Sequence, residues 1–450
     1  MTIQKWMGLC FLSFVASACG DYLDIKPDKR LVVPSTLKDL QAILDNYSVM
    51  NMESTPSLGV VASDDYYLTY NDWQTANLND RNTYAWEKDV FEATDNRPTD
   101  WFIPYRMINY ANIALEGLDK IVPNNSELAA WNGIKGSALF FRAWGHYQLA
   151  QLFCKDYDAA TATQDAGLIL RRESDVEATL SRSSVQDSYD FFLHDLQEAA
   201  KLLPIQVFTT ARPSRVAVYA LLARIYLQMR NYGLALAYAD DALALQTDLL
   251  DYSSLDTSLA YPIEQFNKEV IFQATMNYKG VLSAAKLRVD SLLYASYDDA
   301  DLRKAVYFWD NKGVLTFKGS YDGSLRLFSG LSTSEVYLIK AECEARLGNE
   351  VEGRETLGRL LRLRYRDGQV PLSEEPLLRQ VLNERRKELI LRGLRWSDLR
   401  RLNKEEPYQK TLIRQLDNRQ RVLLPNSNLY TFPFPDIVIS LNGVEQNPRD

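Results

Sequence analysis

Aromatic side chains in polar, loop-like segments are the residues of this sequence whose chemistry points to a ligand. The 450-residue chain is 11% aromatic, with 26 tyrosines. An aromatic ring offers a flat apolar face for stacking, and a Tyr hydroxyl or Trp N–H adds a hydrogen bond at its edge. Packing within the loop or simple exposure is the alternative for any single ring. The stacking candidates are Tyr66, Tyr70, Trp73 and Trp86 in one loop region, and Tyr294, Tyr297, Trp309 and Tyr321 in another.

Polar side chains in the first of these loop regions are able to hydrogen-bond the same ligand. These candidates are Asp64, Asp65, Asn71, Asp72 and Arg81. A cluster in the second region, Asp298-Asp299-Ala300-Asp301, has the oxygen ligands that Ca²⁺ prefers. It lacks the EF-hand spacing and glycine, so we expect a solvated loop face.

Enzyme and metal motifs are missing from the sequence. It has no G-x-S-x-G elbow, P-loop, Rossmann glycine pattern or H-E-x-x-H helix, and its two histidines, His146 and His194, lie far apart. A dyad of Cys154 or Cys343 with a histidine stays open, although burial as small hydrophobic residues is expected for both cysteines. The net charge of −8 and the lack of a basic stripe argue against nucleic acid. The sequence predicts a binding protein without metal or cofactor.

The first twenty residues predict export and a lipid anchor. Lys5 precedes an apolar run from Trp6 to Val15, and the small residues 16–18 lead directly to Cys19. Such a run is too short to cross a bilayer and is typical of a signal peptide. A cysteine after small residues indicates lipidation of Cys19, with 1–18 as signal peptide and 19–34 as tether. Ala16 stands where such motifs usually carry Leu, and a plain secretory signal is the alternative.

Helical periodicity dominates the rest of the chain. We predict helices at 36–44, 101–121, 127–153 and 184–203, helix pairs at 214–245 and 333–364, and polar loop regions at 51–100 and 250–330. The pair at 214–245 has the spacing of a tetratricopeptide repeat, with small alanines where two helices approach closely. The expected fold is mainly α: a tetratricopeptide-like α-α superhelix with large loop-rich insertions that carry short strands. Regions 35–250 and 251–450 are expected to form one compact unit.

Three motifs resemble one known family. Residues 383–401, NERRKELILRGLRWSDLRR, resemble the signature helix of the RagB/SusD family, with Arg392 where the family usually has Glu. Residues 431–448, TFPFPDIVISLNGVEQNP, resemble its C-terminal tail, with Val438 in place of the usual Glu. The opening after Cys19, GDYLDIKP, is typical of mature chains of the family.

This resemblance implies a nutrient-uptake lipoprotein of the Bacteroidetes outer membrane. Such proteins sit as a lid on a TonB-dependent SusC-like barrel at the cell surface and capture an oligosaccharide or, less often, a peptide. Binding residues vary within the family, so none is transferred. A secreted polysaccharide hydrolase and a scaffold that binds only proteins are the alternatives, and catalytic turnover or the absence of sugar affinity would distinguish them.

Overall fold

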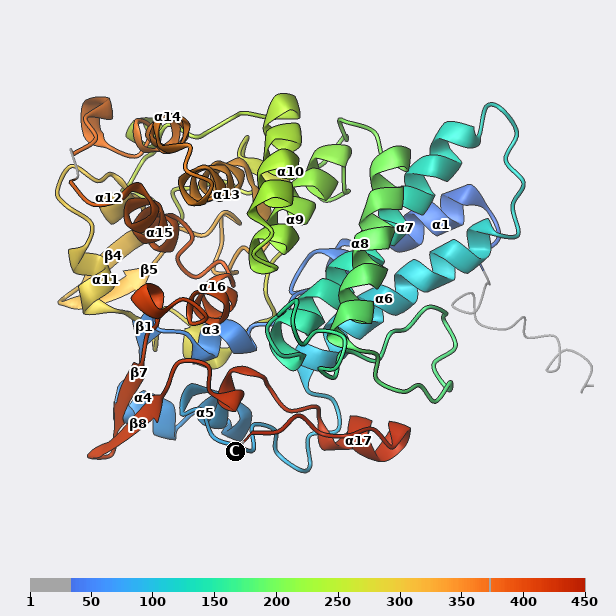
Figure 1. Cartoon of the computed structure of the whole chain (residues 1–450), viewed down its shortest axis with the longest axis horizontal. Helices are drawn as coiled ribbons and strands as arrows, with labels where there is room; N and C mark the ends of the chain where they lie inside the picture. Colours follow the sequence, from blue (N-terminus) through green and yellow to red (C-terminus); the bar gives the residue numbers. More distant parts are fainter. Residues whose placement is uncertain (1–33, 372–373, 450) are drawn as a thin grey trace, which may run out of the picture.

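The computed structural model describes residues 34–371 and 374–449 and shows a mainly helical protein (Figure 1). The predicted signal peptide, Cys19 and nearly all of the tether lie outside the described residues. The helices are α1 (Leu37–Leu44), α2 (Tyr47–Met50), α3 (Leu58–Ala62), α4 (Tyr70–Gln74), α5 (Leu78–Tyr84), α6 (Thr99–Leu118), α7 (Leu128–Phe153), α8 (Val185–Leu202), α9 (Arg215–Gln228), α10 (Tyr232–Leu245), α11 (Ser291–Ala295), α12 (Arg303–Tyr307), α13 (Thr333–Arg346), α14 (Glu350–Leu361), α15 (Leu377–Glu388), α16 (Arg395–Leu402) and α17 (Asp436–Asn442). The strands are β1 (Tyr66–Tyr67), β2 (Val270–Phe272), β3 (Arg288–Val289), β4 (Phe308–Asn311), β5 (Val314–Phe317), β6 (Leu331–Ser332), β7 (Leu412–Leu416) and β8 (Arg419–Leu423).

The long helices pack one after another into a superhelix, which confirms the predicted fold class. Helix α6 packs on α7, α7 on α8, α8 on α9 and α9 on α10. The second repeat continues the array, because α10 contacts α13, which in turn contacts α14 and α15. In Figure 1 the pair α9 and α10 stands between α6–α8 on one side and α13–α15 on the other.

Local sequence explains the clearest repeat, α9 and α10. Ser214 caps α9 by accepting a hydrogen bond from the backbone N–H of Ala217, and the Asn231 side chain caps α10 in the same way. Ala235, Ala239 and Ala242 are the buried residues of α10. Their small side chains let the two helices approach closely, as the sequence predicts.

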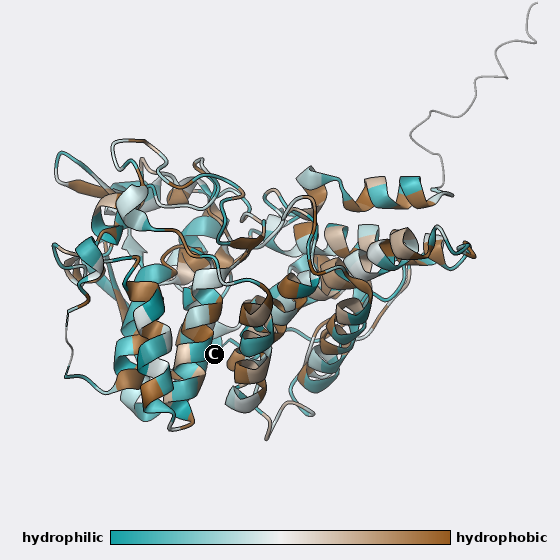
Figure 2. Cartoon of the chain, turned by 90° about the horizontal axis from the view of Figure 1, so that it is seen from above, coloured by the Kyte–Doolittle hydropathy of each residue, from teal (hydrophilic) through white to brown (hydrophobic). Residues whose placement is uncertain are grey.

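The long helices differ in how far they are buried: α8 keeps an exposed polar face, whereas α9 is buried on nearly every side. Figure 2 shows brown apolar and teal polar residues mixed along the helices, with no helix that is brown throughout. Of the helices in the described ranges, none combines the length and the apolar character that crossing a bilayer requires.

Three hydrophobic clusters make up the interior of the described residues, and the smallest lies among α13, α14 and α15. The first surrounds Trp144, whose ring lies 5.4 Å from that of Phe272, and it runs from α1 through the superhelix to Trp396 and Phe432. Trp101 belongs to it as well, so these three tryptophans are core residues, while Trp131 is half-buried. The second cluster lies under the loop regions.

The two predicted loop regions lie side by side, joined by the antiparallel pair of β1 and β3 and by a parallel bridge. Strand β1 pairs with β3, so that Tyr66 faces Val289. The remaining pairs are β2 with β6, β4 with β5, and β7 with β8. Thr55 also bridges Met276, which ties residues 51–100 to residues 250–330 at a second point. The insertion is therefore a single body formed by both loop regions.

The C-terminal tail is bound to the end of α7. Asn447 Nδ2 donates hydrogen bonds of 2.8 Å to the carbonyl oxygens of Phe153 and Phe432. The Gln446 side chain bonds both backbone groups of Phe434, and the Arg449 guanidinium donates to the carbonyls of residues 87 and 88. The QNP segment of the tail motif thus joins the last part of the described chain to the N-terminal region.

Candidate functional site

A cleft of about 660 Å³ opens in the insertion, between the segments 276–287 and 317–327. With the exception of Glu53, every lining residue comes from the loop region predicted at 250–330. The lining residues are Glu53, Tyr261, Met276, Asn277, Tyr278, Lys279, Leu282, Ser283, Ala284, Ala285, Leu287, Phe317, Lys318, Ser320, Gly323, Ser324, Leu325, Arg326 and Leu327. The volume suits a ligand of a few rings.

Backbone hydrogen bonds hold the two walls together. The N–H of Met276 donates to the carbonyl of Leu327 over 2.9 Å, next to an antiparallel bridge between Thr275 and Phe328. The Ser320 hydroxyl accepts from the N–H of Phe328 and donates to the carbonyl of residue 326, closing the turn. Gly323 adopts φ +60° in this turn, a conformation that favours glycine.

The chemistry of the lining combines aromatic faces with a polar rim. Tyr261, Tyr278 and Phe317 supply the rings, and the Tyr278 side chain is 67% exposed. Aliphatic side chains, among them Met276 and Leu287, form the apolar part, and serine, lysine and arginine groups lie among them. A sugar ring presents C–H groups on its faces and hydroxyls at its edge, so this mixture suits stacking with hydrogen bonds around it.

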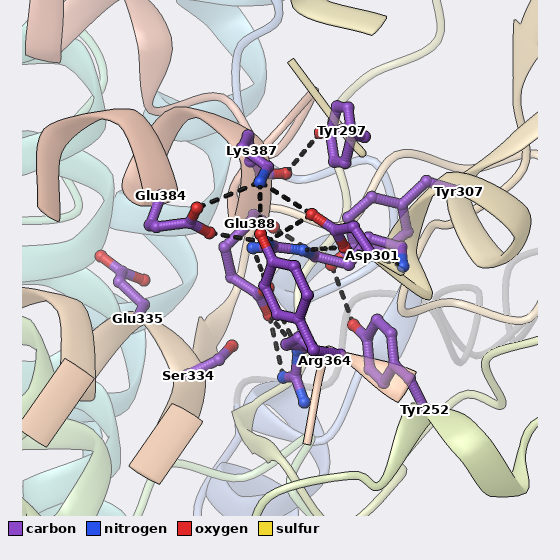
Figure 3. Close-up of polar contacts among 12 residues, drawn as sticks. Tyr252, Tyr297, Asp301, Tyr307, Ser334, Glu335, Arg364, Glu384, Lys387 and Glu388 are labelled. Atoms are coloured by element: carbon purple, nitrogen blue, oxygen red, sulfur yellow. Dashed lines mark hydrogen bonds and ion pairs between the residues drawn. The ribbon is translucent and has the colours of Figure 1, made fainter. Parts of the chain in front are cut away.

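A buried network of polar contacts, part of which Figure 3 shows around Arg364, Glu388 and Lys387, is joined to one wall of the cleft. The hydroxyl of Tyr321, in the turn 320–327, donates to Glu269 over 2.7 Å. Arg364 lies 2.7 Å from Glu269 and 2.9 Å from Glu388, and all three charged side chains are fully buried. Tyr252 joins the network by hydrogen bonds to the hydroxyls of Tyr307 and Tyr321. The wall residue Phe317 in turn packs against Tyr307, with ring centroids 6.0 Å apart.

A second group of buried charges continues this network. Arg303 binds Asp301 over 2.7 Å, Glu384 over 2.5 Å and Glu388 over 3.3 Å. Lys387 binds Asp301 and Glu384 over 2.7 and 3.0 Å. Burial alone raises the pKa of Glu388, but Arg364 and Arg303 outweigh burial and hold that pKa below its ordinary value. Each buried charge thus has a partner of opposite sign, which the low-dielectric interior requires.

The predicted signature segment 383–401 supplies many of these charges. Glu384, Lys387 and Glu388 bind the insertion, whereas Arg386 and Arg395 bind Asp65 and Asp64 at 3.3 and 2.6 Å. Gly393 has φ +81°, the left-handed conformation expected for it. The segment therefore joins the helical array to both loop regions.

Four predicted stacking residues are core residues, which corrects their assignment. Tyr66, Trp86, Tyr297 and Tyr321 are at most 5% exposed, and three of them donate to backbone carbonyls: Tyr66 to residue 61, Trp86 to residue 62 and Tyr297 to residue 387. The Tyr321 hydroxyl is bound to Glu269. Their polar edges are satisfied and their faces covered, so no ligand can stack on them in this structure.

Five further candidates are occupied by neighbouring protein groups. Asp64 forms ion pairs with Arg395, Arg386 and Lys410, and buried Asp65 pairs with Arg386. Asp72 accepts from Thr69 at the start of α4 and pairs with Arg288. Trp73 is half-buried, donates to the carbonyl of residue 81 and lies under the Arg81 guanidinium.

Three predicted residues are exposed, and one is half-buried. Tyr70, Asn71 and Trp309 are exposed, with Trp309 at 57% on the hairpin of β4 and β5. Half-buried Tyr294 packs edge-on against Phe308 at 5.3 Å. None of the thirteen predicted ligand-binding residues lines the cleft. The predicted residues therefore lie in the same insertion as the cleft but outside its lining.

A short pattern repeated in the sequence marks the cleft. Tyr278-Lys279-Gly280 and Phe317-Lys318-Gly319 are both aromatic–lysine–glycine triplets, and the ring and the lysine of each line the cleft. The first triplet closely follows the strand-like run 269–274, and the second ends β5. Glycine favours a turn of the chain. An aromatic residue and a lysine that come before it at the end of a strand therefore lie where the chain turns toward solvent.

The acidic cluster at 298–301 differs from its prediction at one residue. Asp298 and Asp299 are exposed, but Asp301 is buried in the ion pair with Arg303. Among residues 34–371 and 374–449, no group of three or more histidine, cysteine or acidic side chains is arranged to hold a metal ion. Cys154 and Cys343 are free thiols, and both are buried as expected.

Comparison with known proteins places these features in a family context. Residues 21–227 match the family described as starch-binding associating with outer membrane, and residues 319–448 match the SusD family. A SusD-like protein of Formosa agariphila is 29% identical over 162 residues, which cover 35% of this chain and 30% of that protein. The matched part is thus less than two thirds of that relative.

Solved structures share the fold over nearly the whole chain. A SusD superfamily protein of Bacteroides vulgatus has a TM-score of 0.75 at 21% identity, covering 92% of this chain and 99% of the other. One from Bacteroides thetaiotaomicron has a TM-score of 0.73 at 21% identity, covering 92% and 100%. A SusD-like carbohydrate binding protein of Bacteroides vulgatus has a TM-score of 0.67 at 20% identity, covering 91% and 97%.

Proposed function

The chain belongs to the SusD/RagB family, and we propose that it is a glycan-binding lipoprotein that captures an oligosaccharide in the cleft of its insertion. The observation that carries this proposal is the lining of the cleft: three aromatic rings over an apolar base, with serine, lysine and arginine groups among them. This mixture matches the two kinds of surface that a sugar presents.

The family supplies the proposed setting. Lipidation of Cys19 would hold the chain on the outer membrane at the cell surface, where it acts as the lid of a TonB-dependent SusC-like barrel. The rigid join between insertion and superhelix suits a lid, because a buried ionic network fixes the cleft relative to the helices. In this role the chain binds and hands over its ligand, and it is not an enzyme.

Calorimetry with residues 20–450 and a panel of oligosaccharides and peptides tests the proposal. We expect one oligosaccharide to bind without being cleaved. Tyr278→Ala should weaken that binding about fivefold or more, since a stacked ring contributes on the order of 1–3 kcal/mol, whereas Tyr278→Phe should keep it.

Trp309→Ala is the matched control, because Trp309 is an exposed aromatic residue of the same insertion outside the cleft. We expect its binding to equal that of the unaltered chain. Loss of binding in Trp309→Ala but not in Tyr278→Ala would move the site to the β4–β5 hairpin. Binding of peptides alone would replace the glycan with a peptide, and turnover of any glycan would make the chain a hydrolase.

A further inference from the structure

The charged groups that line the cleft differ in sign from the chain as a whole. The chain has a net charge of −8, but the lining includes three cations, Lys279, Lys318 and Arg326, and one anion, Glu53. Whether this excess can attract a ligand depends on which cations already have a partner.

Two of the three cations are paired with carboxylates. Arg326 forms an ion pair of 3.2 Å with Glu53 across the edge of the cleft. Lys279 lies 2.7 Å from Asp100 and 3.8 Å from Asp80, both of them buried. Burial alone lowers the pKa of Lys279, but these two carboxylates outweigh burial and hold that pKa above its ordinary value. Neither cation needs a further counter-ion.

Lys318 is in a different position. Its Nζ donates hydrogen bonds to the carbonyl oxygens of Thr257 and Leu259, over 2.6 and 3.5 Å. Within the described ranges no ion pair involves it, and burial lowers its pKa, only partly offset by the solvent-exposed Asp256. An ammonium group has three N–H donors, so one remains for a ligand in the cleft.

We propose that the Lys318 ammonium binds an acidic group of the oligosaccharide, a uronate carboxylate or a sulfate ester. This inference rests on the proposed function of the cleft and adds the class of ligand to it. A charge-assisted hydrogen bond from Lys318 to the ligand would supply the counter-ion that the protein does not. The Tyr278 and Phe317 rings would hold the sugar faces, so that the acidic substituent at the ring edge reaches the lysine.

Pairs of ligands that differ mainly in charge separate the effect of charge on binding from the effect of sugar shape. The probes are oligomers of galacturonate, glucuronate and mannuronate and sulfated galactose oligomers, each beside its carboxyl-reduced or desulfated partner. We expect the acidic member of at least one pair to bind about tenfold more tightly than its neutral partner. This preference should decrease with added salt, because screening weakens an ion pair at the mouth of a cleft.

Three variants test whether Lys318 causes the preference for the acidic ligand. Lys318→Gln should lower the affinity for the acidic member to that for its neutral partner, and Lys318→Arg should keep most of the difference. Lys312→Gln is the matched control, since Lys312 is an exposed lysine in the turn of the same hairpin and lies outside the cleft. Thermal melting of each variant checks that the loop at 257–259 has not been released.

The outcomes distinguish this inference from the proposed function. Neutral members binding as tightly as acidic ones would overturn the role of Lys318 and leave glycan binding intact. Equal losses for both members in Lys318→Gln would reduce Lys318 to a support for the loop, which also overturns the inference. Binding of no saccharide, or of acidic peptides alone, would overturn both.

Discussion

Helices α6–α10 and the region beneath the cleft bury side chains of similar size but opposite chemistry. Around α7 the large buried residues are rings such as Trp144 and Phe140, which pack with Phe272. Beneath the cleft they include Arg303 and Arg364, which are fully buried and surrounded by carboxylates. The helical interior is mainly apolar, with the buried pair of Arg224 and Glu335 beside it. The region beneath the cleft combines an apolar cluster with a network of directional ion pairs.

The two kinds of interior differ in how precisely they fix the positions of the residues around them. Apolar packing tolerates small shifts, because its free energy follows buried area rather than direction. An arginine–carboxylate pair has a fixed geometry. Tyr321 links the wall of the cleft to Glu269 and through it to Arg364. The ionic region thus sets the position of the wall that a ligand meets.

The largest expected effect comes from removing a charge beneath the cleft. Arg364→Met leaves Glu269 and Glu388 buried without their main cation. Breaking a buried pair in this way costs about 3–5 kcal/mol. Urea unfolding should show this loss in the free energy of unfolding.

The control is Arg359→Met, which removes an exposed arginine paired with Glu355. Exposed pairs contribute little, so we expect a change within about 0.5 kcal/mol. Similar losses in Arg364→Met and Arg359→Met would contradict the distinction between the two interiors.

Lowering the pH should have the second-largest effect on stability, and mainly in the region of buried ion pairs beneath the cleft. The pKa values of Glu388 and Asp398 lie below their ordinary values, because arginines outweigh burial at both carboxylates. A depressed pKa stabilises the fold above the pKa of the unfolded chain, and that contribution is lost as the pH falls through the folded-state value. Stability should therefore decrease below about pH 4.

Hydrogen exchange can show which region loses stability at low pH. In the helical region, burial raises the pKa of Asp195 despite its pairing with Arg142, so protonation there does not remove stability in the same way. At pH 3, amides of 297–307 and 377–388 should lose protection before those of 216–227, after correction for intrinsic rates. The reverse order would refute the comparison.

A volume-conserving change in the apolar region should have a smaller effect. Leu222 is 1% exposed in α9, and Leu222→Met should cost less than about 1.5 kcal/mol. Urea unfolding under the conditions used for Arg364→Met checks this value. A loss above 3 kcal/mol would show that the apolar region is as sensitive as the ionic one.

The smallest change in stability is expected at the cleft itself. The Tyr278 ring is largely exposed, so Tyr278→Ala should alter the free energy of unfolding by no more than about 0.5 kcal/mol. Thermal and urea unfolding measure this. A large loss would mean that the ring supports the insertion, and its effect on binding would then be indirect.

The helical array could be predicted from sequence because its signals are local. The pair predicted at 214–245 is α9 and α10, and the segments 127–153 and 184–203 match α7 and α8 within one residue at each end. Periodicity and caps depend on residues a few positions apart. Trp396 of the signature segment lies in the core, where it packs on Phe432 at 5.6 Å.

The cleft could not be predicted in the same way, because burial of a loop aromatic depends on distant partners. Tyr321 looks like Tyr278 in sequence, yet the Arg392 guanidinium lies 3.7 Å from the centre of the Tyr321 ring, and Glu269 accepts its hydroxyl hydrogen bond. These partners lie 71 and 52 positions away. Loop segments have no period that separates an inward ring from an outward one.

The hydrogen bond from Asn447 to Phe153 also has a consequence in time, because it joins groups 294 residues apart. At a synthesis rate of about 5–20 residues per second, α7 waits about 15–60 s for the side chain that satisfies its C-terminal carbonyl. Arg449 likewise reaches carbonyls 361 and 362 residues earlier in the chain. The N-terminal region is thus synthesised early but gains these contacts only when the last residues of the described chain have been made.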